Sequence, residues 1–278
     1  MNPAPPVTST EVLLQSIMSG QSGRVYTSRN RHCPNEWRSW SICPWRDDKQ
    51  IDRYVVSAST TMVTASIQAR MGSTRLPGKV LLSIRGRRTI DLVRQRCEAA
   101  SSVDHIVFTI GDESPNEAII KWCDRNGHRY VVGPEEDLLA RHRLSLDQTG
   151  DGTLVRVTGD CPFVPPSEID RLVDRHSGNG ETYTSNATDR MPVGTAVDVL
   201  DRSVLRELAE RGETHPAVPL RESPDEWGSV IDDSAAWAEL GAAHTAVDTP
   251  ADYWALVDAV RAVGLDPREV TEWVAENR

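Results

Sequence analysis

Three basic residues crowd one short loop of the sequence. The stretch IQARMGSTRLPGKVL, residues 67–81, holds Arg70, Arg75 and Lys79 together with two glycines and a proline. Like charges held this close repel one another, so the spacing predicts that the loop binds an anion. Glycine lets the backbone approach a ligand closely, and arginine and lysine neutralise phosphates, so a phosphate is the favoured anion. A basic surface loop without a ligand is the alternative.

The loop matches neither of two common glycine-rich phosphate motifs. A P-loop requires G-x₄-G-K-[ST]. Here five residues separate Gly72 from Gly78, and Val80 follows Lys79 where the magnesium-binding hydroxyl should be. The sequence also lacks G-x-G-x-x-G, which argues against a dinucleotide site. We therefore expect a phosphate-binding loop of a different kind.

Two aspartates follow strand-like stretches farther along the chain. Asp160 lies in VTGDCPFVPP and Asp248 in HTAVDTPADYW. Carboxylates suit Mg²⁺, which keeps several waters and takes one or two protein carboxylates along with substrate phosphates. With the basic loop, they make metal-assisted phosphoryl or nucleotidyl transfer the predicted chemistry. Simpler roles stay open, with Asp160 in a turn or helix cap and Thr249 as the cap of a helix that begins with proline.

Alternating strands and helices must position these residues. Apolar runs predict strands at 62–68, 105–110, 129–133 and 154–159, then strand-like stretches at 182–186 and 196–200. Helical spacing occurs at 89–99, 114–126, 135–146, 166–176, 203–211, 249–263 and 267–276. Strands separated by helices of ~10–15 residues predict an α/β fold with a mostly parallel, twisted sheet flanked by helices.

Two local signals refine this pattern. Ser114-Pro115-Asn116-Glu117 matches a capping box with proline at the first helical position, and Gly127 is the predicted end of that helix. Ligands bind beyond the carboxyl ends of parallel strands. We therefore expect the basic loop, Asp160 and Asp248 at one edge of the sheet.

Composition excludes several classes of protein. A hydrophobic content of 38% over 278 residues supports a sizeable core, and no stretch approaches the ~20 apolar residues of a membrane span. The first 30 residues lack the pattern of a secretory signal. Five cysteines without paired spacing argue for a reducing compartment. A net charge of −10 disfavours nucleic-acid binding, so we expect no nucleic-acid partner. Taken together, these features predict a cytoplasmic protein.

Residues 1–61 differ from the rest of the chain. They contain proline and serine near their start, three tryptophans and no clear periodicity. One histidine and two cysteines lack the close cysteine pair of a structural zinc site. We expect a disordered extension, or a stretch translated from a wrongly assigned start with Met62 as the true beginning. The folded domain is predicted to span 62–278.

Six motifs occur in the order found in one enzyme family: QARMGSTRLPGKVL, EEDLLARH, RVTGDCPFVPP, TSN, VGTAVDVL and AVDTPADYW. Over about residues 62–264 the chain resembles cytidylyltransferases of the spore-coat polysaccharide synthesis type, relatives of CMP-Kdo and acylneuraminate cytidylyltransferases. The S-T-R-L-P-G-K run is the most specific part. The resemblance implies a Rossmann-like nucleotide-diphospho-sugar transferase fold and the reaction CTP + sugar → CMP-sugar + pyrophosphate, which supplies surface polysaccharide synthesis.

The resemblance also implies a role for each matching residue. It implies that Arg70, Lys79 and Asp160 are catalytic and that Asp160 and Asp248 bind Mg²⁺ as cofactor. The implied nucleotide-binding residues are Gln68, Ala69, Arg70, Met71, Gly72, Ser73, Arg75, Lys79 and Gly159, and those implied for the sugar acceptor are Asn186, Asp198 and His215. The implied partners are CTP and the acceptor, and a homodimer stays open.

Two departures from the family pattern fall on the sugar side. Relatives have G-L-D-V-E-V where this chain has GTAVDV, so Ala196 replaces the first acidic residue and Asp198 keeps the second. The R-E-H stretch of relatives resembles Glu213-Thr214-His215, without its arginine. An altered acceptor pocket is therefore expected. The alternatives are a glycosyltransferase of the same fold, which a missing D-x-D motif disfavours, and a nucleotide-binding protein without turnover.

Overall fold

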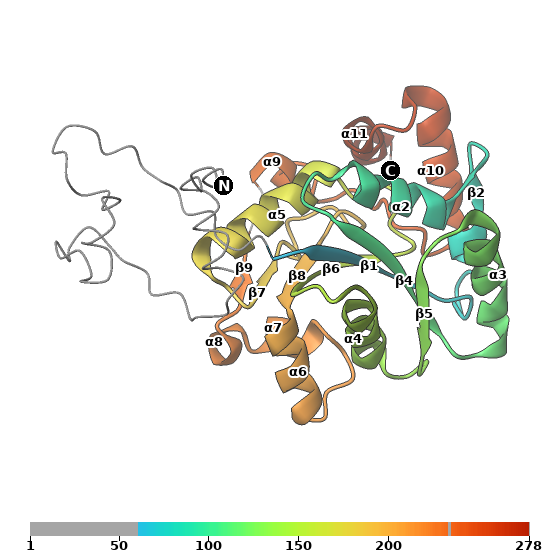
Figure 1. Cartoon of the computed structure of the whole chain (residues 1–278). Helices are drawn as coiled ribbons and strands as arrows, with labels where there is room; N and C mark the ends of the chain where they lie inside the picture. The colour runs from blue at the N-terminus through green and yellow to red at the C-terminus, as the bar shows by residue number, and fades with distance from the viewer. Residues whose placement is uncertain (1–60, 233–234, 278) are drawn as a thin grey trace, which may run out of the picture. The chain divides into compact units, whose positions relative to one another are not determined.

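The computed structural model describes residues 61–232 and 235–277, and their central feature is a seven-stranded sheet (Figure 1). The expectations for the segment 1–61, including a start at Met62, concern residues that lie outside this description except for Thr61. The sheet has the order β5-β4-β1-β6-β8-β7-β9. Its strands are β1 (Val63–Ala69), β4 (His105–Gly111), β5 (Tyr130–Gly133), β6 (Thr153–Thr158), β7 (Tyr183–Ser185), β8 (Asp198–Asp201) and β9 (Val230–Ile231).

Strand direction confirms the predicted, mostly parallel α/β sheet. The strands β5, β4, β1 and β6 pair in parallel, with Ile67 of β1 opposite Phe108 on one side and Val157 on the other. Only β8 runs against its neighbours β6 and β7, while β9 is parallel to β7. The carboxyl ends of β1, β4, β5 and β6 therefore meet at one edge, as the site hypothesis requires.

Helices flank the sheet, and most lie where the sequence predicts them. The longer ones are α2 (Thr89–Ala99), α3 (Glu117–Asn126), α4 (Leu138–Thr149), α5 (Pro166–Asn179), α6 (Arg202–Glu210), α10 (Pro250–Val263) and α11 (Pro267–Asn277). The shorter elements are η2 (Lys79–Leu81), β2 (Ser83–Ile84), β3 (Arg87–Arg88), η3 (Ser114–Asn116), α7 (Val218–Glu222), α8 (Pro224–Trp227) and α9 (Ala235–Ala238). No helix of the described residues is both long and apolar enough to span a membrane.

The capping box predicted at Ser114 is wrong. Residues 114–116 form a separate 3₁₀ turn, and no side chain caps either that turn or α3. The Asn116 side chain instead donates to the Gly111 carbonyl and accepts from the Met71 N–H, so tertiary contacts replace the local cap. Gly127 does end α3, in the left-handed conformation that glycine favours.

The helix predicted from Glu135 begins three residues later. Asp137 is its N-cap, and its carboxylate accepts from the Ala140 N–H. A cap residue lies outside the helical conformation, which limits the start to Leu138.

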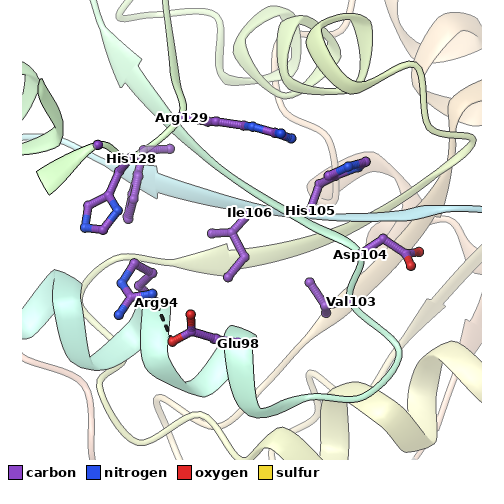
Figure 2. Close-up of a pocket in the computed structure, with 10 residues that line it drawn as sticks. Arg94, Glu98, Val103, Asp104, His105, Ile106, His128 and Arg129 are labelled. Carbon is purple, nitrogen blue, oxygen red and sulfur yellow. Dashed lines mark ion pairs between the residues drawn. The ribbon is translucent and has the colours of Figure 1, made fainter.

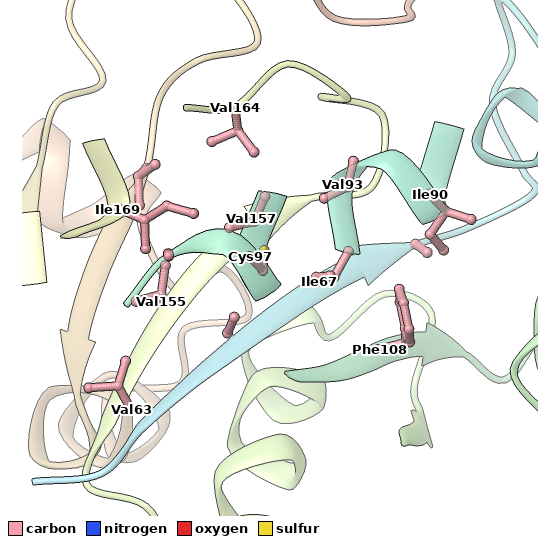
Figure 3. Packing of buried hydrophobic residues seen from close by; sticks show 14 of the residues in the cluster. Val63, Ile67, Ile90, Val93, Cys97, Phe108, Val155, Val157, Val164 and Ile169 are labelled. Atoms are coloured by element: carbon pink, nitrogen blue, oxygen red, sulfur yellow. The ribbon is translucent and has the colours of Figure 1, made fainter. Parts of the chain in front are cut away.

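The two faces of strand β1 have different environments. Ala65 and Ile67 pack with Val93 and Cys97 of α2 and with Ile169 of α5 in the largest apolar cluster (Figure 3). The opposite face carries two fully buried hydroxyls. Thr64 donates to Asp151, and Ser66 hydrogen-bonds His142 of α4. Buried polar groups without partners are costly, so the bond to His142 fixes α4 against the sheet, and the bond to Asp151 fixes the turn that follows α4.

The capping box at Thr249 positions the segment that carries Asp248. The Thr249 hydroxyl accepts from the Asp252 N–H, and the Asp252 carboxylate accepts from the Thr249 N–H at 2.7 Å. Pro250 occupies the first helical position, which needs no amide donor. The predicted capping role of Thr249 is confirmed.

Replacing Thr249 with alanine should lower the free energy of unfolding by about 1 kcal/mol, because it deletes the N-cap acceptor. Urea denaturation of Thr249→Ala against the wild-type protein measures this loss. Thr249→Ser keeps the hydroxyl and is the matched control. An equal loss in both variants would assign the effect to the methyl group rather than to the cap.

Candidate active site

The basic loop is folded by its own backbone. It leaves β1 at Ala69, and the N–H groups of Ser73 and Gly78 both donate to the Met71 carbonyl, at 2.9 and 3.0 Å. Gly78 has a φ of 73°, a left-handed conformation that costs glycine nothing. The turn delivers Lys79 as the first residue of η2.

Lys79 joins two distant segments of the chain. Its Nζ lies 2.5 Å from Oδ2 of Asp160 and 2.8 Å from Oδ1 of Asp248. A guanidinium nitrogen of Arg75 lies 3.1 Å from the same Oδ1 of Asp248. The Val247 N–H donates to the Asp160 carbonyl at 2.8 Å, so backbone contact holds the two acidic segments together. The structure thus brings these four sequence-predicted residues to one place.

Charge pairing maintains this cluster in its ionised state. Burial alone would lower the pKa of Lys79, but the Asp160 carboxylate and hydrogen bonds to both aspartates raise that pKa above its ordinary value. Burial would likewise raise the pKa of Asp160, and the ammonium beside it lowers that pKa below its usual range. Both groups stay charged near neutral pH.

Arg70 lies apart from this cluster, on the side of β5. Its guanidinium is 3.9 Å from a carboxylate oxygen of Glu135, a residue that sequence reasoning missed. The other Glu135 oxygen accepts from the Asn116 side chain at 2.8 Å and lies 4.0 Å from Arg141. Each basic residue of the loop therefore has a carboxylate partner from another segment.

Gly159 is required by a close backbone approach. Its N–H donates to the Gln68 carbonyl at 2.8 Å. A Cβ on Gly159 would lie 2.8 Å from that same oxygen, closer than real Cβ atoms come. Glycine here keeps the loop after β6 against the end of β1, whereas Gly72 has open space, with Glu113 as the nearest group at 3.9 Å.

A second polar cluster surrounds Asp198, beside β7. Its carboxylate is 1% exposed and accepts from the Tyr183 and Ser185 hydroxyls, each at 2.8 Å. It also pairs with Arg156 at 2.8 Å and with Arg221 of α7 at 2.5 Å. Burial would raise the pKa of Asp198, and the two guanidinium groups hold that pKa far below its usual range.

His215 belongs to this second cluster, whereas Asn186 holds backbone in place. The Nδ1 of His215 accepts from the N–H groups of Ala217 and Val218. Burial and the charge of Arg156 lower the pKa of His215 to about 4, so the ring is neutral near pH 7. Asn186 is fully buried, accepting from the Val197 N–H and donating to Glu168.

Sequence reasoning did not predict several residues of these clusters. Arg156 interrupts an otherwise apolar strand, and that signal could have identified it. Glu135 opens the motif EEDLLARH, and that signal could have identified it. Arg221 gave no local signal. His244 also gave none, and its Nε2 lies 3.3 Å from the Asp248 carboxylate.

A hollow at the other end of β4 is separate from both clusters. It has a volume of about 350 Å³ and is lined in part by Arg94, Glu98, His105, His128 and Arg129 (Figure 2). Some of its charges pair within the chain, with Arg94 at 3.0 Å from Glu98 and His105 at 2.9 Å from Asp151. His105 begins β4, whereas the basic loop meets the opposite ends of the strands.

The acidic pair fits a divalent cation with few protein ligands. Asp160 and Asp248 offer oxygen donors to one central cation, the position that the Lys79 ammonium now fills. No group of three or more His, Cys, Asp or Glu side chains arranged for a metal occurs within 61–232 and 235–277. That donor set suits Mg²⁺, which completes its shell with water and substrate phosphates.

The fold is one that nucleotidyltransferases of known structure share. Similar solved structures include a cytidylyltransferase from Leptospira borgpetersenii, with a TM-score of 0.71 and 21% identity over 78% of this chain and 95% of that one. A CMP:2-keto-3-deoxy-manno-octonic acid synthetase complexed with CTP gives a TM-score of 0.57 and 17% identity over 73% and 99% of the two chains. At these identities the likeness establishes the fold.

Sequence comparison gives the family. The Cytidylyltransferase family model matches residues 64–226, and the chain belongs to that family. The spore coat polysaccharide biosynthesis protein SpsF of Bacillus subtilis is 32% identical over 57% of this chain and 69% of its own length. The 3-deoxy-manno-octulosonate cytidylyltransferase of Idiomarina loihiensis is 30% identical, over 53% of this chain and 57% of its own. The family resemblance seen in the motifs is confirmed.

Replacing Asp198 with asparagine should strongly destabilise the protein. The variant leaves Arg156 and Arg221 half-buried without their counter-charge, a loss of about 3–5 kcal/mol. Urea denaturation measures it. The double variant Asp198→Asn/Arg221→Met removes one of the orphaned charges and should lose less than the sum of the single variants. Strict additivity would refute the coupling of Asp198 to Arg221.

His215 should make stability depend on pH in the acidic range. Its pKa in the folded protein lies below the ordinary value of about 6.5, so the unfolded chain takes up the proton first. Stability is therefore full above about pH 6.5 and is lost as the pH falls towards 4. His215→Asn retains a hydrogen-bond acceptor without this titration. Urea midpoints at about pH 7 and about pH 5 should differ less in the variant than in the wild-type protein, and an equal difference would contradict the assignment.

Proposed function

We propose that the protein is a Mg²⁺-dependent cytidylyltransferase that transfers CMP from CTP to a sugar for surface polysaccharide synthesis and releases pyrophosphate. The observation that carries this proposal is the cluster of Arg75, Lys79, Asp160 and Asp248. It joins phosphate-binding cations to the two carboxylates that a Mg²⁺ ion accompanying a triphosphate requires.

The chain's own groups supply binding and charge stabilisation. A sugar hydroxyl attacks the α-phosphorus of CTP, and negative charge builds on the α-phosphate and on the departing pyrophosphate. Arg75 and Lys79 supply positive charge beside Asp160 and Asp248, and Arg70 would add its charge from the side of Glu135. Mg²⁺ held by Asp160 and Asp248 would neutralise phosphate charge and orient the leaving group. Positioning of the two substrates supplies the rest of the rate acceleration, and no protein nucleophile is required.

The second cluster favours a carboxylate-bearing acceptor. Arg156 and Arg221 share one aspartate, Asp198, which leaves one positive charge in excess next to the neutral His215. A sugar acid would balance that charge. The relative named as a 3-deoxy-manno-octulosonate cytidylyltransferase supports this choice. Because Asp198 is already fully engaged, we assign it the role of holding the two arginines rather than touching the sugar.

Pyrophosphate release tests the proposal directly. We expect release from CTP with at least one member of a panel of sugar acids in Mg²⁺, and none in EDTA. Asp160→Asn should abolish release and keep the wild-type circular dichroism, because it removes one ligand charge. Asp258→Asn, on the exposed face of α10, is the matched control and should remain active.

Other outcomes favour the alternatives. CTP binding without turnover on any acceptor would favour a nucleotide-binding protein, the reading that Ala196 supports. Full activity of Asp160→Asn would remove that aspartate from the metal site.

A further inference from the structure

The position between Asp160 and Asp248 already contains a cation. The Lys79 ammonium lies 2.5 and 2.8 Å from one oxygen of each carboxylate, distances at which it fills the space between them. The Lys79 side chain is only 12% exposed, so it is enclosed there rather than extended into solvent. Two carboxylates this close would repel each other without it. Lys79 therefore holds the acidic pair in place.

A divalent cation and the ammonium cannot share this position. Both need the same carboxylate oxygens, and their like charges repel most strongly where water is partly excluded. Arg75 adds a further positive charge 3.1 Å from Asp248. A dication that approaches alone must therefore displace two bound cations, of which Lys79 is the more enclosed.

We propose that Lys79 is an exchangeable counter-cation that keeps metal out of the site until a nucleoside triphosphate arrives. The triphosphate draws Lys79 and Arg75 from the carboxylates, and the metal that accompanies it takes their place on Asp160 and Asp248. Every charge keeps a partner throughout this exchange. The inference rests on the proposed function, since it identifies the acidic pair as the metal ligands.

The local backbone suits such an exchange. Lys79 follows Gly78, whose left-handed conformation ends the loop, and only its side chain has to turn from one partner to the other. Four methylene groups give that side chain many rotamers. The aspartates are fixed more firmly. Asp160 follows β6 and its carbonyl accepts from Val247, while Asp248 directly precedes the capped start of α10.

The prediction is that nucleotide-free protein gains metal affinity when Lys79 loses its charge. Mn²⁺ is the probe, and the fall in the electron paramagnetic resonance signal of free Mn²⁺ measures binding to the full chain. Lys79→Met should bind Mn²⁺ at least about tenfold more tightly than the wild-type protein, because the competing charge is gone. Mn²⁺ should also raise the midpoint of thermal unfolding of Lys79→Met and leave that of the wild-type protein unchanged.

Three further variants make the result specific. Lys79→Arg keeps the positive charge and should show no gain of Mn²⁺ affinity. Lys79→Gln should show the same gain as Lys79→Met, and it is the variant to use if Lys79→Met folds poorly. Lys121→Met changes an exposed lysine on α3 and should behave as the wild-type protein. Adding Asp160→Asn to Lys79→Met should abolish the gain.

The failures of the two proposals are distinguishable. Pyrophosphate release by the wild-type protein with no gain of Mn²⁺ affinity in Lys79→Met or Lys79→Gln would overturn the counter-cation role and leave the proposed function intact. A gain of affinity in a protein that neither binds nor turns over CTP would support the counter-cation and overturn the proposed function. Equal Mn²⁺ affinity in the wild-type protein and both variants would overturn the inference under any result with CTP.

Discussion

Charge compensation at one edge of the sheet is the constraint on which the site depends. The loop after β1 carries three cations, and each needs a carboxylate that the loop itself does not contain. Three different segments supply them: the stretch after β5, the end of β6 and the residues before α10. The carboxyl ends of parallel strands bring the segments after β1, β5 and β6 to the same edge. The segment before α10 joins them through the Val247 N–H bond to the Asp160 carbonyl. A loop that would repel itself in isolation is thereby stabilised by the fold.

The two clusters solve the problem of buried charge in different ways. Beside the basic loop, the pairs end in long side chains that can turn to another partner. Around Asp198 the carboxylate itself is buried, and the Tyr183 and Ser185 hydroxyls also donate to it. Exchange of partners suits a substrate that brings its own cation. A locked network suits recognition of a fixed shape, where orphaned charges would be costly.

Periodicity and strand-end reasoning predicted the parallel sheet, most helices and the meeting of Lys79 with Asp160. These features depend on local pattern and on a general rule of parallel sheets. The strand predicted before Asp248 is wrong, because no strand lies among the described residues between β9 and α10. Asp248 reaches Lys79 through the segment that the Val247 N–H bond to the Asp160 carbonyl holds in place. Arg221 could not be predicted, because it lies on a five-residue helix that only tertiary packing places beside Asp198. The error at Ser114 has a similar origin. The local sequence matches a capping box, but the Asn116 side chain hydrogen-bonds the backbone of Met71 and Gly111 instead of capping a helix.

The stretch of chain that contains the antiparallel strand β8 supplies most of one cluster and none of the other. All parts of the cluster around Asp198 except Arg156 come from one continuous stretch, from β7 to α7. The cluster of Arg75, Lys79, Asp160 and Asp248 draws on residues before and after that stretch. Substitutions within that stretch can therefore change the surroundings of Asp198 while Arg75, Lys79, Asp160 and Asp248 stay the same. Ala196, one of the two departures from the family pattern, lies within that stretch.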